Sequence, residues 1–386
     1  MKSVLYWSPY LSNVATIKNV IKSALSLKKY SKIYKPIILD AFKEWQDYDE
    51  IFKKHGIQKD EISKLNLKEH YPFEGFLKSR LCSIIVIIWN FFPLLKYLKN
   101  NKPDYLIIHL LSSLPLFLLI FFKFKTKMIL RISGLPKKNF LRFILWKIIA
   151  KKILFVTCPS EETRDMLIKK KIFSVSKIIV LYDPIIEINE INQSINKNVP
   201  TNETLQKPYF LSIGRLTKQK NHVLLVHLLE FLRSKNIDMR IYILGSGENK
   251  KKLQRILNKK NLNQNIIFLG YKKNIFPYLK NCDAVISPSL WEDPGAVMVE
   301  ASYARKSIIC SDCPSGPKEF INNGKRGYIF KNNSISSMNE VVLNFLKDDD
   351  QIKLQKIKNA QKQVKNFTMV NHYRILVRAL AYYQLK

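Results

Sequence analysis

Two carboxylates stand eight positions apart in the stretch SLWEDPGAVMVEAS, which covers residues 289–302. Glu292 comes before a Pro-Gly step, and Glu300 follows the apolar run behind that step. Proline suits the first turn of a helix, because the N–H that it lacks would be unpaired there. We therefore expect a helix to begin here, with backbone amides that attract an anion. Carboxylates on either side would accept hydrogen bonds from sugar hydroxyls, unless Glu300 is an ordinary surface charge.

Two further segments carry residues that could bind a phosphate. Arg215 and Lys220 lie in GRLTKQKN (214–221), between a predicted strand and a predicted helix, where two cations suit a diphosphate. Gly245 and Gly247, in ILGSGENKKKLQ (243–254), would let the backbone approach a ligand, although a tight turn explains them equally well. A solvated basic loop is the alternative for the first segment. The lack of a GxGxxG pattern argues against a dinucleotide oxidoreductase.

His109 and the cysteines are the remaining candidates for chemistry. His109 ends a predicted strand in the first half, where it could reach an interdomain cleft or could be a satisfied core histidine. Cys310 and Cys313 form a CxxC pair without a second pair or histidines at matching spacing, so we predict no metal site. An odd number of widely spaced cysteines argues against disulfides and for a reducing compartment.

Short apolar runs alternate with helical patterns along the chain, which has 386 residues. This alternation predicts an α/β protein with two doubly wound sheets, and ligands bind such sheets at the carboxyl ends of the strands. Residues 187–207 are polar and lack apolar periodicity, which predicts a linker. The predicted division is therefore an N-terminal domain over residues 1–186, a C-terminal domain over 208–366, and a terminal helix over 367–386 that packs back toward the first domain.

Two apolar segments, residues 81–98 and 105–122, have nearly the length of a membrane span. The second contains a histidine, two serines and a proline, so we interpret it as strand, loop and helix. The N-terminus lacks the apolar core of a signal peptide. We therefore expect a cytoplasmic protein without a spanning helix.

The second half resembles the family-4 retaining glycosyltransferases of the GT-B fold, in which two Rossmann-like domains face each other across a cleft. The resemblance rests on GRLTKQKN, ILGSGE, FLGY, SPSLWEDPGAVMVEAS and PSGPKEFINNGKRGYIF, and above all on two glutamates with seven residues between them. It covers most of residues 209–330. The first half matches weakly, through KPDYLIIHL, TCPSEET and VLYDPI.

The resemblance implies transfer from a nucleotide sugar, with UDP-sugars favoured, and no other cofactor or metal. It implies that Arg215 and Lys220 bind the donor diphosphate together with the amides of Gly295, Ala296 and Val297. Glu292 would support the charge that develops at the reacting carbon, Glu300 would bind the ribose, and His109 would contact the donor sugar.

The loop after the first strand departs from the family pattern. Many members carry two glycines there, whereas this chain has SPYLSNVATIKNV. Ser12, Asn13 and Thr16 offer side-chain donors instead, so we expect them to contact phosphate or acceptor. Asp183 stands where many members have asparagine, and we assign it no role.

The formal net charge of +35 predicts an anionic partner. Residues 137–152 mix six basic residues with large apolar ones, which favours peripheral binding to an anionic membrane, although a buried helix with a basic rim would look the same. We expect a glycolipid or polysaccharide acceptor at the inner face of the cytoplasmic membrane. The alternatives are a transferase with a soluble acceptor, a family relic that binds without catalysis, and a nucleic-acid-binding protein. The sequence lacks a compact nucleic-acid-binding motif, so we expect no nucleic-acid partner.

Overall fold

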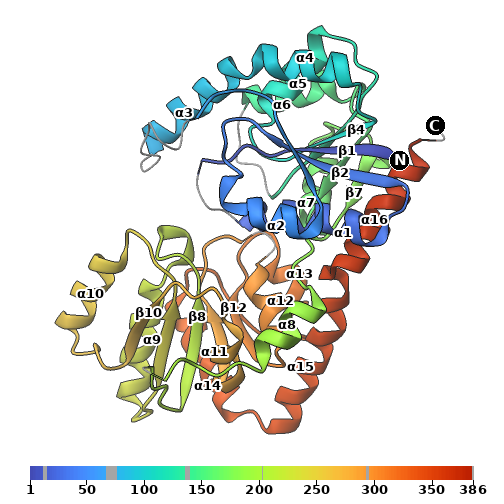
Figure 1. Cartoon of the computed structure of the whole chain (residues 1–386). Coiled ribbons are helices and arrows are strands. Elements are labelled where there is room, and N and C mark those ends of the chain that lie inside the picture. The colour runs from blue at the N-terminus through green and yellow to red at the C-terminus, as the bar shows by residue number, and fades with distance from the viewer. Residues whose placement is uncertain (12–14, 67–75, 135–139, 202, 293–294, 385–386) are drawn as a thin grey trace. The chain divides into compact units, whose positions relative to one another are not determined.

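The computed structural model describes residues 1–11, 15–66, 76–134, 140–201, 203–292 and 295–384. These residues form two compact units (Figure 1). Unit 1 consists of Met1–Pro184 together with Met369–Lys386, and unit 2 consists of Ile185–Thr368. Each unit has its own parallel sheet covered by helices, as the alternation of apolar runs and helical patterns predicts.

Unit 1 contains a seven-stranded parallel sheet in the order β3-β2-β1-β4-β5-β6-β7. Its strands are β1 (Lys2–Trp7), β2 (Tyr34–Asp40), β3 (Gln58–Glu61), β4 (Tyr105–Ile108), β5 (Lys127–Arg131), β6 (Phe155–Cys158) and β7 (Ile178–Val180). Its helices are α1 (Ala15–Tyr30), α2 (Asp49–His55), α3 (Phe76–Trp89), α4 (Phe91–Asn101), α5 (Ser113–Phe121), α6 (Phe140–Ile149), α7 (Glu161–Lys169) and α16 (Met369–Tyr382).

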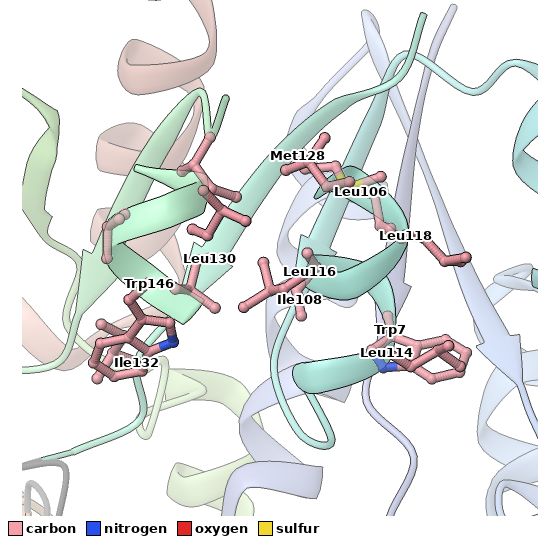
Figure 2. Close-up of a cluster of buried hydrophobic side chains, with 14 of the residues drawn as sticks. Trp7, Leu106, Ile108, Leu114, Leu116, Leu118, Met128, Leu130, Ile132 and Trp146 are labelled. Carbon is pink, nitrogen blue, oxygen red and sulfur yellow. The ribbon is translucent and has the colours of Figure 1, made fainter. Parts of the chain in front are cut away.

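Both faces of this sheet are buried, which is why its strands are continuous apolar runs. On β1, Leu5 and Trp7 join one apolar cluster while Val4 and Tyr6 join another, as the alternation of side chains along a strand requires. Figure 2 shows the first cluster, in which α5 and Trp146 of α6 cover the sheet. The terminal helix α16 adds three residues to the second cluster and packs on α1, so it belongs to unit 1.

Unit 2 contains a six-stranded parallel sheet in the order β10-β9-β8-β11-β12-β13. Its strands are β8 (Tyr209–Ile213), β9 (Arg240–Leu244), β10 (Ile266–Gly270), β11 (Ala284–Ser287), β12 (Ser307–Ser311) and β13 (Tyr328–Phe330). Its helices are α8 (Ile188–Ile195), α9 (Val223–Ser234), α10 (Lys250–Lys259), α11 (Phe276–Asn281), α12 (Ala296–Tyr303), α13 (Pro317–Ile321), α14 (Ile335–Lys347) and α15 (Asp350–Val364).

The structure places the division of the chain differently from the sequence-based prediction. The first unit ends at Pro184, and the polar stretch 187–207 lies within unit 2 instead of linking two domains. Helix α8 begins this stretch and packs on α11, with Ile191 as its buried residue. Ile188, Ile191 and Ile195 have the spacing of one helix face, a signal of only two turns that the prediction of a linker missed. Residues 365–368 also belong to unit 2, and α16 begins at Met369.

The apolar segments of unit 1 form short elements. Residues 105–122 contain β4, a turn and α5, as predicted. Within the described parts of the chain, no single helix has both the length and the hydropathy of a membrane span. Residues 80–89 of α3 and helix α4 meet that test only as a pair, and they are bent by 44°.

Gly245 allows two loops of unit 2 to touch, and we expect its replacement to destabilise the unit. A Cβ there would lie 2.0 Å from the carbonyl oxygen of Gly214, and the residue has a φ of +151°. Gly245→Ala should therefore lower the free energy of unfolding by about 3 kcal/mol or more in denaturant titrations. Gly270 is the matched control, since it has a φ of +73° and no atom within 4 Å of its Cβ position. Gly270→Ala should cost only about 1–2 kcal/mol. Equal losses of stability in the two variants would contradict the predicted steric clash at residue 245.

Candidate active site

The sheet of unit 2 reverses its direction of winding between β8 and β11. From β8 the chain continues to β9 on one side, whereas β11 continues to β12 on the other side. Ligands of open α/β sheets bind at such a switch point, beyond the carboxyl ends of the strands. The loop after β8 carries Arg215 and Lys220, and the loop after β11 carries Glu292. The predicted cations and the first predicted carboxylate thus flank the position that the topology favours.

Lys220 and Glu292 are the residues that the structure brings into direct contact. The Lys220 ammonium donates to Oε1 of Glu292, and the side chains are only 17% and 9% exposed. The Ser289 hydroxyl donates to the same oxygen over 2.6 Å. Gly214 makes room for the lysine, because a Cβ there would lie 2.7 Å from Cε of Lys220. The carboxylate is therefore held by two donors in one orientation.

Hydrogen bonds between the loop of Lys220 and the loop of Glu292 hold this ion pair in place. The Leu290 amide donates to the carbonyl of Gln219 over 2.8 Å, and the Gln219 side-chain amide donates to the carbonyl of Trp291 over 2.9 Å. Both bonds involve the residue next to Lys220. Gln219 and Ser289 were not predicted as site residues, since neither type has a characteristic spacing from Glu292.

Helix α12 begins directly after the Glu292 loop. Its N-cap is Gly295, with φ +83° and ψ +62°, and a Cβ there would lie 2.2 Å from Cε of Met298. Only glycine fits this left-handed, crowded position without strain. The amides of Ala296 and Val297 follow in the first turn, where a helix lacks intrahelical acceptors and favours anions. Pro294, which was expected to start the helix, lies outside the described residues.

The remaining predicted residues of unit 2 lie near this centre. Arg215 is exposed on the loop that carries Lys220, as expected of a cation that meets a ligand. Glu300 is half-buried, five residues or about 7 Å along α12 from Gly295. Gly245 and Gly247 pack against the backbone of the Arg215 loop; a Cβ on Gly247 would lie 2.5 Å from the carbonyl oxygen of Leu216. This packing favours the tight-turn interpretation of the two glycines.

In unit 1, His109 lies at the carboxyl end of β4. Its ring stacks on Tyr6 with 6.0 Å between centroids, and its Nε2 is buried without a hydrogen-bond partner among the described residues. A cavity of about 10 Å³ lies against the ring, which is about the room that one water molecule needs. Thr16 lies in the first turn of α1 and is half-buried, whereas Ser12 and Asn13 lie outside the described residues. The roles assigned to these four residues stay predictions.

A buried ion pair lines the same cavity, and the sequence-based analysis missed it. Arg131, at the end of β5, donates over 2.6 Å to Asp183 and over 2.6 Å to the carbonyl of Leu181. Burial raises the pKa of Asp183, and the guanidinium opposes that rise. The available signal was two opposite charges, each following an apolar strand of the same predicted sheet.

Helix α16 contributes His372 to the cavity wall. Its Nδ1 lies 2.7 Å from the carbonyl of Tyr182, and its Nε2 lies 2.8 Å from the Ser23 hydroxyl. A carbonyl can only accept, so Nδ1 carries the proton and Nε2 of a neutral ring accepts from Ser23. The Tyr6 hydroxyl lies 3.0 Å from Ser23 and completes the chain of hydrogen bonds. The network fixes the tautomer of a neutral His372.

Three buried histidines should make the protein sensitive to acid. Burial lowers the pKa of His372 and of His222 to about 3 each, and burial lowers the pKa of His109 well below 6.5. Below pH 6.5 the unfolded chain binds protons that the folded chain refuses. The free energy of unfolding should therefore be highest above pH 6.5. It should fall toward pH 3 by about 1.4 kcal/mol per pH unit for each histidine.

Urea titrations between pH 7.5 and 5 would measure this slope. His372→Gln, which can still donate to Tyr182, should make the slope shallower by one histidine's share. His55→Gln, on the exposed end of α2, controls for the loss of an imidazole. An unchanged slope in the His372 variant would show that this ring binds protons equally in the folded and the unfolded chain.

No group of three or more His, Cys, Asp or Glu side chains gathers as a metal-binding cluster within the described part of the chain. Cys310 and Cys313 are both buried as free thiols. Burial raises the pKa of Cys313 to about 12, with a smaller opposing effect from Ser311, so this thiol is protonated at neutral pH.

Comparison with known proteins shows that this chain is similar to glycosyltransferases. Residues 194–364 match the family described as glycosyl transferases group 1. An uncharacterized glycosyltransferase of Methanocaldococcus jannaschii is 28% identical over 76% of this chain and 73% of its own length. The N-acetylgalactosamine-N,N'-diacetylbacillosaminyl-diphospho-undecaprenol 4-alpha-N-acetylgalactosaminyltransferase of Campylobacter jejuni is 25% identical over 78% of both chains.

The fold has a similar counterpart among solved structures. A glycosyltransferase from Rickettsia africae superimposes with a TM-score of 0.75 at 17% identity, over 99% of this chain and 98% of that one. This similarity confirms the predicted fold of two Rossmann-like α/β domains.

Proposed function

We propose that the chain is a retaining hexosyltransferase of the group 1 glycosyltransferases, because residues 194–364 match that family and the fold is that of the GT-B enzymes. It moves a hexose or an N-acetylhexosamine from a nucleotide sugar to a lipid-linked or polysaccharide acceptor during synthesis of a cell-surface glycan. The observation that supports this most strongly is the oriented Lys220–Glu292 pair at the switch point of unit 2.

The chemistry follows from the charges around that pair. When the bond between the anomeric carbon and the phosphate oxygen breaks, negative charge grows on the diphosphate and positive charge grows on the sugar. Lys220, Arg215 and the first amides of α12 stabilise the diphosphate, and a metal ion is not required in this proposal. Glu292 stabilises the sugar, and Glu300 binds the ribose. The acceptor hydroxyl forms the new bond and gives its proton to the departing diphosphate.

The donor and acceptor are proposed on different grounds. UDP-sugars are the most common donors of family-4 enzymes, so a UDP-sugar is the first candidate. The C. jejuni relative acts, according to its name, on a diphospho-undecaprenol-linked sugar, which supports a lipid-linked acceptor here. An acceptor of that kind lies in a membrane. We therefore propose that the enzyme works as a peripheral protein at the inner face of the cytoplasmic membrane.

A thermal-shift screen of UDP-, GDP-, ADP- and dTDP-sugars, run with a chelator present, tests donor binding. We expect one nucleotide series to raise the melting temperature and plain diphosphate to raise it much less. Arg215→Met should abolish the shift, whereas Lys218→Met, which removes an exposed cation from the same loop, should retain it. Stabilisation by every polyanion alike, or by none, would contradict the proposal.

A further inference from the structure

The helices α3 to α6 of unit 1 expose an unusual number of large apolar side chains. Their exposed fractions range from 38% to 77%, and the residues are Leu81, Ile84, Ile88, Trp89, Phe92, Phe117, Phe121, Phe140, Leu141, Ile144 and Ile148. Soluble proteins scatter such residues singly, and a continuous group of them marks an interaction surface. We call this group the apolar surface of unit 1.

Contacts between the helices make this one continuous surface. Helix α3 packs on α4, α4 on α5, and α5 on α6, and Figure 1 shows the four helices together along one side of the sheet of unit 1. The rings of Phe117 and Phe121 lie 4.7 Å apart, and Phe91 of α4 lies 5.2 Å from Phe92 and 6.3 Å from Phe117. The aromatic side chains of α4 and α5 therefore meet.

The spacing on the outer helices shows that the exposure is systematic. Ile88 follows Leu81 and Ile84 at helical spacing on α3, and Phe140, Ile144 and Ile148 repeat every four residues on α6. Opposite faces of these helices supply buried residues, among them Val86 and Trp146. Each helix thus has one apolar face toward the core and a second toward solvent.

The charges around this surface identify its partner. The four helices contain no acidic residue, and exposed basic residues accompany the apolar ones: Arg80, Lys96, Lys99, Arg142 and Lys147. The surface of a protein partner usually carries charges of both signs. An anionic bilayer, in contrast, presents only negative charge above an apolar interior. Long basic side chains bury their stems and keep their charges among headgroups, and aromatic rings favour the same depth.

We propose that the apolar surface of unit 1 enters the headgroup region of an anionic lipid bilayer, with Trp89, Phe92 and Phe121 among the residues that insert. The membrane contact is therefore broader than residues 137–152, of which only α6 takes part in it. The membrane contact shares with the proposed function the idea of a membrane-borne acceptor. Vesicle binding requires neither donor nor acceptor, so the membrane contact and the proposed function can be disproved separately.

Vesicle flotation of the full chain tests the proposal. We expect the wild-type protein to float with vesicles that contain phosphatidylglycerol and less with pure phosphatidylcholine. Phe92→Ser/Phe121→Ser should lower the partition coefficient by about tenfold or more, since each ring loses its burial in lipid. The control Ile352→Ser/Leu354→Ser removes two exposed apolar residues from α15 of unit 2 and should bind normally. Circular dichroism verifies that both variants fold.

Tryptophan fluorescence measures insertion separately from charge attraction. Trp89 and Trp291 are the exposed tryptophans, at 58% and 42%, so Trp291→Phe leaves Trp89 as the one exposed reporter beside three buried tryptophans. Brominated lipids should quench its emission, and further replacement of Trp89 by Phe should remove that quenching. Equal flotation of the double serine variant and the wild type would overturn the proposal. So would the absence of quenching, or a stable dimer through this surface in place of vesicle binding.

Discussion

Glu292→Gln should lower kcat by about 10²–10³-fold and leave the fold intact. Glutamine keeps the shape of the side chain and can still accept from Ser289, but it removes the negative charge that faces Lys220. The positive charge that develops on the sugar then lacks its stabilising partner, while donor binding through the diphosphate persists. We therefore expect the loss in kcat and little change in KM for the donor.

Steady-state kinetics with the donor found in the thermal-shift screen would measure this effect. Glu340→Gln removes an exposed carboxylate from α14 in the same unit and should match the wild type. Circular dichroism at the assay temperature would verify that both variants are folded and would separate catalysis from folding. Full activity of the Glu292 variant would contradict the role assigned to this residue.

Arg131→Met should lower the free energy of unfolding by about 3–5 kcal/mol, because it leaves the carboxylate of Asp183 buried without its partner. The Arg131 and Asp183 side chains are only 4% and 10% exposed. Replacing both residues, as in Arg131→Met/Asp183→Leu, removes the unpaired charge and should restore part of the loss. Denaturant titration of the full chain, followed by fluorescence, would measure the free energies of unfolding of the wild type, the single variant and the double variant.

The exposed pair of Arg164 with Glu161 provides the control, at 36% and 50% exposure. Arg164→Met should cost well under about 1 kcal/mol, because water screens the pair. If the two arginine variants lose equal stability, burial is not what makes the Arg131 pair important. If the double variant is no better than Arg131→Met, packing of the guanidinium decides the outcome, not its charge.

Features with strong local signals were predictable from the sequence. Buried strands such as Tyr209–Ile213 are short runs of large apolar residues, and the loops behind them carry Arg215, Lys220 and Glu292. Parallel sheets place such loops on one edge of the sheet. The pattern therefore predicted that these residues gather in unit 2. The order and register of the strands, however, depend on contacts between distant segments.

Other features depended on tertiary contacts that a sequence does not display. Strands β2 and β3 were not predicted, because β2 contains a proline and β3 reads QKDE, which is wholly polar. The Arg131–Asp183 pair joins residues 52 positions apart. The exposure of Phe121 could not be distinguished from core burial, since its helix, α5, is apolar on nearly all sides.

The anomeric configuration of the product tests the central claim most directly. The enzyme would be incubated with the donor that stabilises it and with a membrane-lipid extract of the producing organism, and NMR would identify the configuration of the transferred sugar. Glu292→Gln would provide the background. We predict that the sugar keeps the configuration that it had in the donor. An inverted product, or no transfer from a donor that binds, would contradict the proposal of a retaining glycosyltransferase.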